Sequence, residues 1–193
     1  MNSGQKIIIV GSGIGGLVSA LILAKHGYQV QVLEKNHQIG GSLQVFSRDK
    51  KIFDTGVHYV GGLDKGENLY RIFKYLDIYD DLEMKRLDED AFDIVRLSNG
   101  ITAKHGMGYE NFSARLKQVF PDHTADVDRI VDEIRLYCSY FPLYNIEMDS
   151  DINYVEHHEV LEVGAWERLS ELTENEDLIK VVRGEAEQGR VSV

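Results

Sequence analysis

The fold of this chain is decided close to its N-terminus by residues 6–16, which read KIIIVGSGIGG. The β-branched run at 6–10 predicts a fully buried parallel strand. Apolar side chains at 14–26 recur with a helical period, and Gly27 stands where helices commonly end. Residues 29–33 alternate polar and apolar side chains, which indicates a second strand. This order predicts a βαβ unit, and with it an α/β, Rossmann-like FAD/NAD(P)-binding domain.

The glycines of the turn each have a physical task in binding a dinucleotide. Gly11 allows the tight turn, Gly13 lets a pyrophosphate approach the backbone, and Gly16 lets the helix pack on the strand. Amide groups at the helix start would face the phosphates, with the helix dipole behind them. No lysine stands where a Walker-type loop requires one, which disfavours an NTPase. The motif expected to bind the cofactor consists of Gly11, Ser12, Gly13, Ile14, Gly15 and Gly16.

An acidic residue closes the second strand, as a ribose-binding carboxylate would. Glu34 follows Gly11 by 23 positions, close to the roughly 20 expected for that role. Such a carboxylate accepts hydrogen bonds from ribose hydroxyls and repels a 2′-phosphate. The site is therefore expected to disfavour NADP.

A second glycine pair favours FAD over NAD. Glu34 and Lys35 are followed by Gly40 and Gly41, the spacing of the extended fingerprint found in flavoproteins with two dinucleotide domains. The paired glycines would bring the backbone near the pyrophosphate and the flavin end. An NAD-dependent dehydrogenase with one Rossmann domain remains an alternative at this point.

A further stretch, FDTGVHYVG at 53–61, supplies a family resemblance. Together with Gly41, Ser42 and Leu43 it resembles the phytoene desaturase, carotenoid isomerase and retinol saturase group of FAD-dependent oxidoreductases. The resemblance is sharp over 6–62 and looser over 82–178.

The resemblance implies a cofactor, a chemistry and a substrate class. The chemistry is hydride transfer through the flavin across a carbon–carbon bond of an apolar polyene or retinoid-like molecule. Residues 54–56 would run beside the flavin, and His58 is a weak candidate for a proton donor. The residues implied in holding FAD beyond the glycine turn are Glu34, Lys35, Gly40, Gly41, Ser42, Asp54, Thr55 and Gly56.

The length suggests a three-part division. We expect a FAD-binding βαβ core with a flavin-side segment at 1–62, a partial α+β substrate-side region at 63–183, and a frayed tail at 184–193. Members of the resembling family are far longer and end with a segment that closes over the flavin. The interpretation is thus a C-terminally truncated enzyme. The alternative is a non-catalytic nucleotide-binding fragment.

The region at 63–183 contains clear local signals. Asn99-Gly100 between apolar-rich runs at 92–97 and 101–104 predicts a hairpin. Helical periodicity predicts helices at 69–75, 111–120, 124–140, 166–172 and 177–182.

Composition narrows the possible partners. The formal net charge of −11 disfavours nucleic acid and simple electrostatic docking on anionic lipid. The single cysteine, Cys138, excludes an internal disulfide and favours a reducing compartment. No stretch is long and apolar enough to span a bilayer, so we expect a cytoplasmic protein that binds a small apolar substrate, with peripheral membrane contact left open. No metal site is expected, because His157 and His158 have no third ligand spaced nearby.

Overall fold

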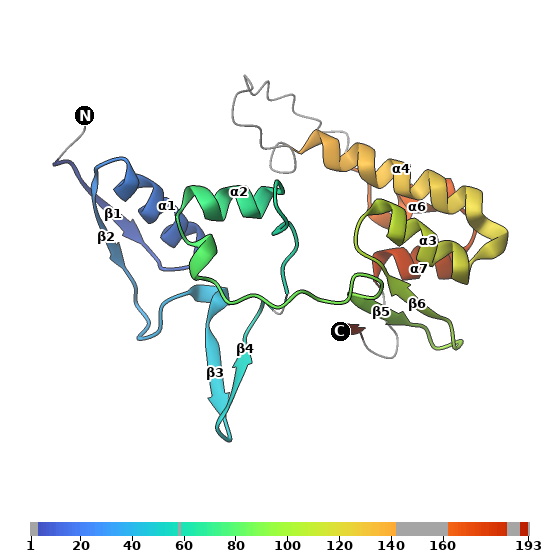
Figure 1. The fold of residues 1–193 in the computed structure, drawn as a ribbon, viewed down its shortest axis with the longest axis horizontal. Coiled ribbons are helices and arrows are strands. Elements are labelled where there is room, and N and C mark those ends of the chain that lie inside the picture. Colours follow the sequence, from blue (N-terminus) through green and yellow to red (C-terminus); the bar gives the residue numbers. More distant parts are fainter. Residues whose placement is uncertain (1–3, 58, 142–161, 185–189, 193) are drawn as a thin grey trace. The chain divides into compact units, whose positions relative to one another are not determined.

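The computed structural model describes residues 4–57, 59–141, 162–184 and 190–192. The chain divides into two compact units, Met1–Leu82 and Glu83–Val193, here called the N-terminal and C-terminal units. Figure 1 labels the elements of both.

The N-terminal unit begins with the expected βαβ motif. Strand β1 (Lys6–Val10) pairs in parallel with β2 (Gln29–Leu33), and the register runs from Lys6↔Gln29 to Val10↔Leu33. Helix α1 (Ile14–Lys25) connects the two strands and packs on them. Gly27 adopts φ +86°, a conformation that side chains disfavour, and this ends the helix turn. The Rossmann-like prediction for this segment is confirmed.

A short 3₁₀ turn, a hairpin and a second helix complete this unit. The turn η1 (Gly41–Leu43) leads into β3 (Val45–Arg48), which pairs antiparallel with β4 (Lys51–Asp54). The hairpin is closed by Asp49 and Lys50, both with positive φ, as in the turn type that matches strand twist. Helix α2 (Asn68–Tyr75) and the 3₁₀ turn η2 (Tyr79–Asp81) follow.

The prediction that β1 is fully buried is wrong. Ile8 is 62% exposed and Val10 84% exposed, whereas Ile7 and Ile9 are half-buried. Residue Ile9 faces α1, since its methyl carbon lies near Gly16. Only β2 pairs with β1 among the described strands, and α1 covers one face. Within the described residues, β1 is therefore covered by α1 on one face and is exposed on the other.

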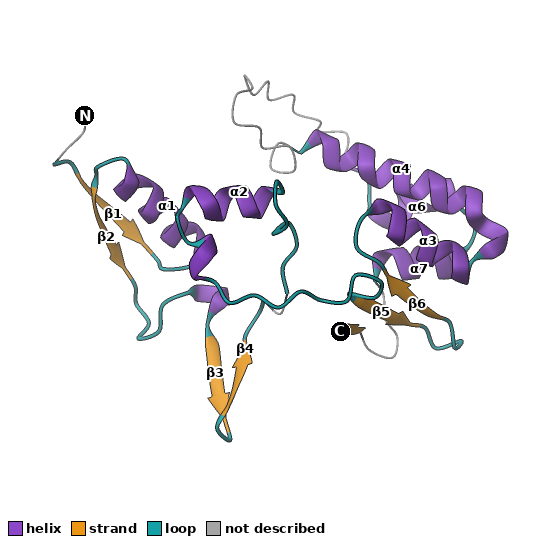
Figure 2. Cartoon of the chain, in the orientation of Figure 1, coloured by secondary structure: helices purple, strands orange, loops and turns teal. Residues whose placement is uncertain are grey.

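The C-terminal unit is an α+β layer arrangement with its own core. Strands β5 (Asp93–Arg96) and β6 (Thr102–His105) form the predicted antiparallel hairpin around Gly100. Four described helices pack with this sheet (Figure 2): α3 (Tyr109–Val119), α4 (Thr124–Tyr140), α6 (Ala165–Leu172) and α7 (Glu176–Arg183). Their buried side chains form one cluster with those of the sheet, including Val95, Leu116, Ile130, Leu178 and Val181.

Two features bear on the expected three-part division, which itself stays a prediction. The N-terminal unit extends to Leu82, whereas the expected FAD-binding part ended at 62. Contacts join the C-terminal ends of α1 and α2: Lys25 is ion-paired with Asp77, and His26 Nε2 lies 3.1 Å from the Tyr75 hydroxyl. In the expected frayed tail, Arg190–Ser192 form strand β7, which pairs antiparallel with β5. An open strand edge readily accepts such a partner. Within the described residues no helix is long and apolar enough to cross a membrane.

Candidate nucleotide-binding site

The first glycine turn is fixed by two backbone requirements. Gly11 has φ +99°, and its amide donates to the Leu33 carbonyl at 2.7 Å, which ties the turn to the end of β2. A Cβ on Gly16 would lie 2.2 Å from the Gly11 carbonyl oxygen. Glycine at these two positions is thus required by the turn itself and by the close packing of α1 on it.

The presence of glycine at positions 13 and 15 needs a different explanation. A Cβ at either position would meet nothing within 4 Å, and Gly13 has an ordinary φ of −66°. Neither contacts within the chain nor backbone conformation therefore requires glycine there. Gly13 is also the N-cap of α1, which begins without a side-chain cap and without an acidic residue in its first turn. Open space beside uncapped helix amides suits an approaching anionic group such as a pyrophosphate.

The second glycine pair lies directly against the first turn. Gly40 and Gly41 have φ values of +110° and +58°, and Gly40 forms an isolated parallel bridge with Gly13. The Gly40 amide donates to the Ser12 carbonyl at 3.0 Å. A Cβ on Gly41 would lie 2.9 Å from Gly13 Cα. The two glycine segments, in which the bridged Gly13 and Gly40 are 27 positions apart in sequence, form one backbone surface.

Glu34 is held at the edge of this surface as a carboxylate. Its Oε2 accepts from the Ser12 amide at 2.9 Å and from the Ser12 hydroxyl at 2.7 Å, and its Oε1 accepts from the Asn36 amide at 2.9 Å. These bonds, with that from Asn36 the largest contribution, lower the pKa of Glu34 to about 2. The Lys35 amide lowers the pKa of Glu34 in the same direction, so every one of these donors favours the ionised form of this carboxylate.

The segment expected beside the flavin reaches the same region through η1. The Thr55 amide donates to the Gln44 carbonyl at 3.1 Å, and a Cβ on Gly56 would lie 3.1 Å from the Ser42 carbonyl oxygen. Asp54, at the end of β4, is exposed. The structure thus connects residues 54–56 to the turn that follows Gly40.

For the other predicted site residues, the structure gives no side-chain contact with the glycine turn or does not describe the residue. Ile14, Lys35 and Ser42 are exposed, and no described contact ties their side chains to the glycine turn. His58, the weak catalytic candidate, lies outside the described residues, as do His157 and His158. Sequence reasoning missed the role of Asn36, whose amide bonds Glu34. The signal was its position two residues after the acidic residue, a spacing typical of side-chain-to-backbone turns.

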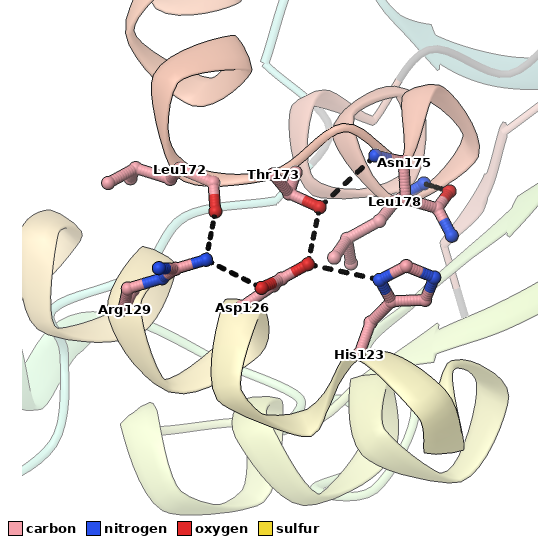
Figure 3. A network of polar contacts seen from close by, with 7 residues as sticks. All are labelled: His123, Asp126, Arg129, Leu172, Thr173, Asn175 and Leu178. Carbon is pink, nitrogen blue, oxygen red and sulfur yellow. Dashed lines mark hydrogen bonds and ion pairs between the residues drawn. The ribbon is translucent and has the colours of Figure 1, made fainter.

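The C-terminal unit has a polar network of its own, which joins α4 to the loop between α6 and α7 (Figure 3). Asp126 accepts from the Thr173 hydroxyl at 2.7 Å, lies 3.0 Å from His123 Nδ1, and pairs with Arg129 at 2.6 Å. Arg129 also donates to the Leu172 carbonyl. Contact with His123, and then with Thr173, lowers the pKa of Asp126. Each oxygen of Asp126 has a structural partner, so the network stabilises the loop.

Comparisons with known proteins agree with this geometry. Residues 9–76 match the family model described as an NAD(P)-binding Rossmann-like domain. Human all-trans-retinol 13,14-reductase is 33% identical over 143 residues, which are 70% of this chain and 22% of that protein. The 4,4'-diapolycopene oxygenase of Methylomonas sp is 44% identical over 55 residues, 28% of this chain and 11% of that protein.

A solved structure of putrescine oxidase bound to putrescine has a TM-score of 0.56 and 18% identity, and covers 91% of this chain and 35% of that chain. At this identity the likeness shows the fold.

The fold and the matched segment define a Rossmann-type dinucleotide-binding protein. More particularly, the chain is similar to the retinol 13,14-reductases and to diapolycopene oxygenase, so the family resemblance expected from residues 6–62 is confirmed. The chain spans about a fifth or less of the length of the human reductase and the Methylomonas oxygenase.

Proposed function

We propose that the N-terminal unit binds FAD and serves an oxidoreductase that acts on carbon–carbon bonds of an apolar polyene or retinoid-like substrate. The observation that carries the proposal is the open position at Gly13. Glycine is needed there neither for φ nor for packing, whereas a pyrophosphate lying against the backbone would need it.

Each part of the site has a separate task in this proposal. The amides of the first turn of α1 bind the pyrophosphate, supported by the helix dipole. The Glu34 carboxylate accepts hydrogen bonds from the ribose and repels a 2′-phosphate. Gly40 and Gly41 bring a second stretch of backbone alongside the first turn, and residues 54–56 extend this surface toward the flavin.

FAD, when bound, supplies hydride transfer across a carbon–carbon bond. The substrate class is supported by the names of the relatives, which act on retinol and diapolycopene. The description of the matching family model, NAD(P)-binding, favours NAD as the second candidate cofactor. The contact of Gly41 with Gly13 favours FAD, because this second glycine pair is uncommon in NAD sites.

Equilibrium titration of the 193-residue chain with FAD, ADP, NADH and NADPH tests the cofactor. We expect FAD and ADP to bind, NADH to bind more weakly than FAD, and NADPH to bind weakest because Glu34 faces its 2′-phosphate. Tighter binding of NADH than of FAD would instead support the dehydrogenase alternative.

A second experiment separates an enzyme from a nucleotide-binding fragment. The chain with bound, chemically reduced flavin is mixed anaerobically with all-trans-retinol or another conjugated polyene, and the flavin absorbance is followed. Return of the oxidised flavin band, with loss of one substrate double bond, is the expected result. Binding of FAD without any reoxidation would assign the chain to the non-catalytic alternative.

A further inference from the structure

Ser12 is the most enclosed side chain of the candidate site, although it sits in the middle of a glycine turn. Its side chain is 0% exposed. The Ser12 hydroxyl donates to Glu34 Oε2 at 2.7 Å. The hydroxyl oxygen, Ser12 Oγ, also accepts from the Gly40 amide at 3.3 Å. One buried oxygen therefore contacts the segments that carry the acidic residue and the second glycine pair.

This bonding leaves Ser12 no hydrogen-bond donor with which to bind a nucleotide phosphate directly. A serine hydroxyl has one proton to donate, and here that proton is given to Glu34. The Ser12 amide is also used by Glu34, and its carbonyl by Gly40. The sequence interpretation grouped Ser12 with the cofactor-binding residues, whereas its contacts point inward.

We propose that Ser12 is a positioning residue, which orients the Glu34 carboxylate for the nucleotide sugar and links it to the Gly40 segment. The inference rests on the proposed nucleotide-binding function. Its physical basis is that a hydrogen bond to an ionised acceptor is about twice as strong as a neutral one. Loss of the hydroxyl leaves Oε2 with the Ser12 amide alone and so holds the carboxylate less firmly.

The proposal makes a specific prediction for coupling between two residues. Ser12→Ala should weaken FAD binding about tenfold, the effect of losing one charge-assisted hydrogen bond. In a Glu34→Ala background the same substitution should weaken binding less than twofold, because Ser12 acts through the carboxylate. Ser19→Ala is the matched control, because Ser19 is an exposed serine on α1. The Ser19→Ala variant should bind FAD with the affinity of the unsubstituted chain.

The binding experiment has two contradicting outcomes. Unchanged affinity in Ser12→Ala would show that the hydroxyl has no positioning role. An equal loss with and without Glu34 would show that Ser12 acts by another route. Either result would overturn the inference while FAD binding by the unsubstituted chain upheld the proposed function.

A measurement without nucleotide keeps the inference testable if the chain binds no FAD. The Glu34 carboxyl is followed by carbon-13 NMR between pH 6 and 3.5 in the unsubstituted chain and in the Ser12→Ala variant. Because the Ser12 hydroxyl contributes to the low pKa of Glu34, the unsubstituted chain should keep this carboxylate ionised across the range. In Ser12→Ala protonation should begin at higher pH. Superimposable titrations would contradict the inference.

Discussion

The two units of this chain differ in what holds them together. Among the described residues, Leu76 is the one buried apolar side chain of the N-terminal unit, whereas the C-terminal unit has a contiguous core drawn from its sheet and four helices. The N-terminal unit instead relies on backbone contacts between glycine segments and on the bonds of Ser12 and Glu34. Most of the large apolar side chains that are exposed also lie in this unit, Ile8 and Val10 among them.

A cofactor site and a stable core thus use separate parts of this sequence. A site for a pyrophosphate requires bare backbone at close range, and glycines contribute no apolar area to a core. The C-terminal unit has the opposite composition at its centre, where Leu116, Ile130 and Leu178 are fully buried. Substitutions should therefore affect folding in one unit and ligand binding in the other.

The largest expected effect is on the C-terminal core. Leu116→Ala should lower the free energy of unfolding of this unit by about 2–5 kcal/mol, because it removes a fully buried side chain and leaves a cavity. Val10→Ala, at a position 84% exposed on β1, should cost less than about 1 kcal/mol. Hydrogen exchange followed by mass spectrometry reports each unit separately. Similar losses for both variants would contradict the contrast in burial.

A second substitution tests the close packing of the glycine turn. Gly16→Ala should destabilise the N-terminal unit by about 1–3 kcal/mol, since the added Cβ would lie 2.2 Å from the Gly11 carbonyl oxygen. Gly15→Ala, one residue earlier in α1, places its Cβ in open space and should stabilise the helix by about 0.5–1 kcal/mol. Hydrogen-exchange rates of the α1 amides measure the stability change in both variants. Equal effects of the two alanines would show that packing on Gly11 is unimportant.

The smallest effect concerns acid stability of the C-terminal unit. The folded state lowers the pKa of Asp126, so this carboxylate contributes stability that is present above about pH 4 and lost as the pH falls through its lowered pKa. Asp126→Asn should cost about 1 kcal/mol at pH 7 and flatten the decline of stability below pH 4. Urea unfolding at several pH values measures this.

Asp132→Asn is the control for that experiment, because Asp132 is exposed on the same helix. It should leave both the stability and its pH dependence unchanged. An identical acid decline in Asp126→Asn and the unsubstituted chain would contradict a stabilising role for the network in Figure 3.

Local signals were sufficient for much of the fold. The helix at 124–140 was predicted with the bounds that the structure gives, and the hairpin around Gly100 follows from Asn-Gly between two apolar runs. The βαβ unit followed from the period of its apolar residues and from Gly27. These features depend on residues close together in sequence, so a local pattern specifies them.

Features that depend on distant residues were not accessible in the same way. The burial of β1 depends on which strands lie beside it, and its composition alone could not show that β2 is its one neighbour among the described strands. Pairing of Arg190–Ser192 with β5 joins residues about 100 positions apart. The inward-facing bonds of Ser12 depend on where Glu34 and Gly40 meet the turn. Such contacts are set by tertiary packing, which a local pattern does not record.

Binding of FAD to Gly13→Val, compared with binding to Gly164→Val, tests whether the glycine turn binds a pyrophosphate. Both glycines are helix N-caps with φ −66°, and a Cβ on either would meet nothing within 4 Å, so the two substitutions should cost the fold similar amounts. We expect Gly13→Val to reduce FAD affinity at least tenfold and Gly164→Val to leave it unchanged, as measured by flavin fluorescence. Equal affinity of the two variants for FAD would contradict a pyrophosphate site at the glycine turn.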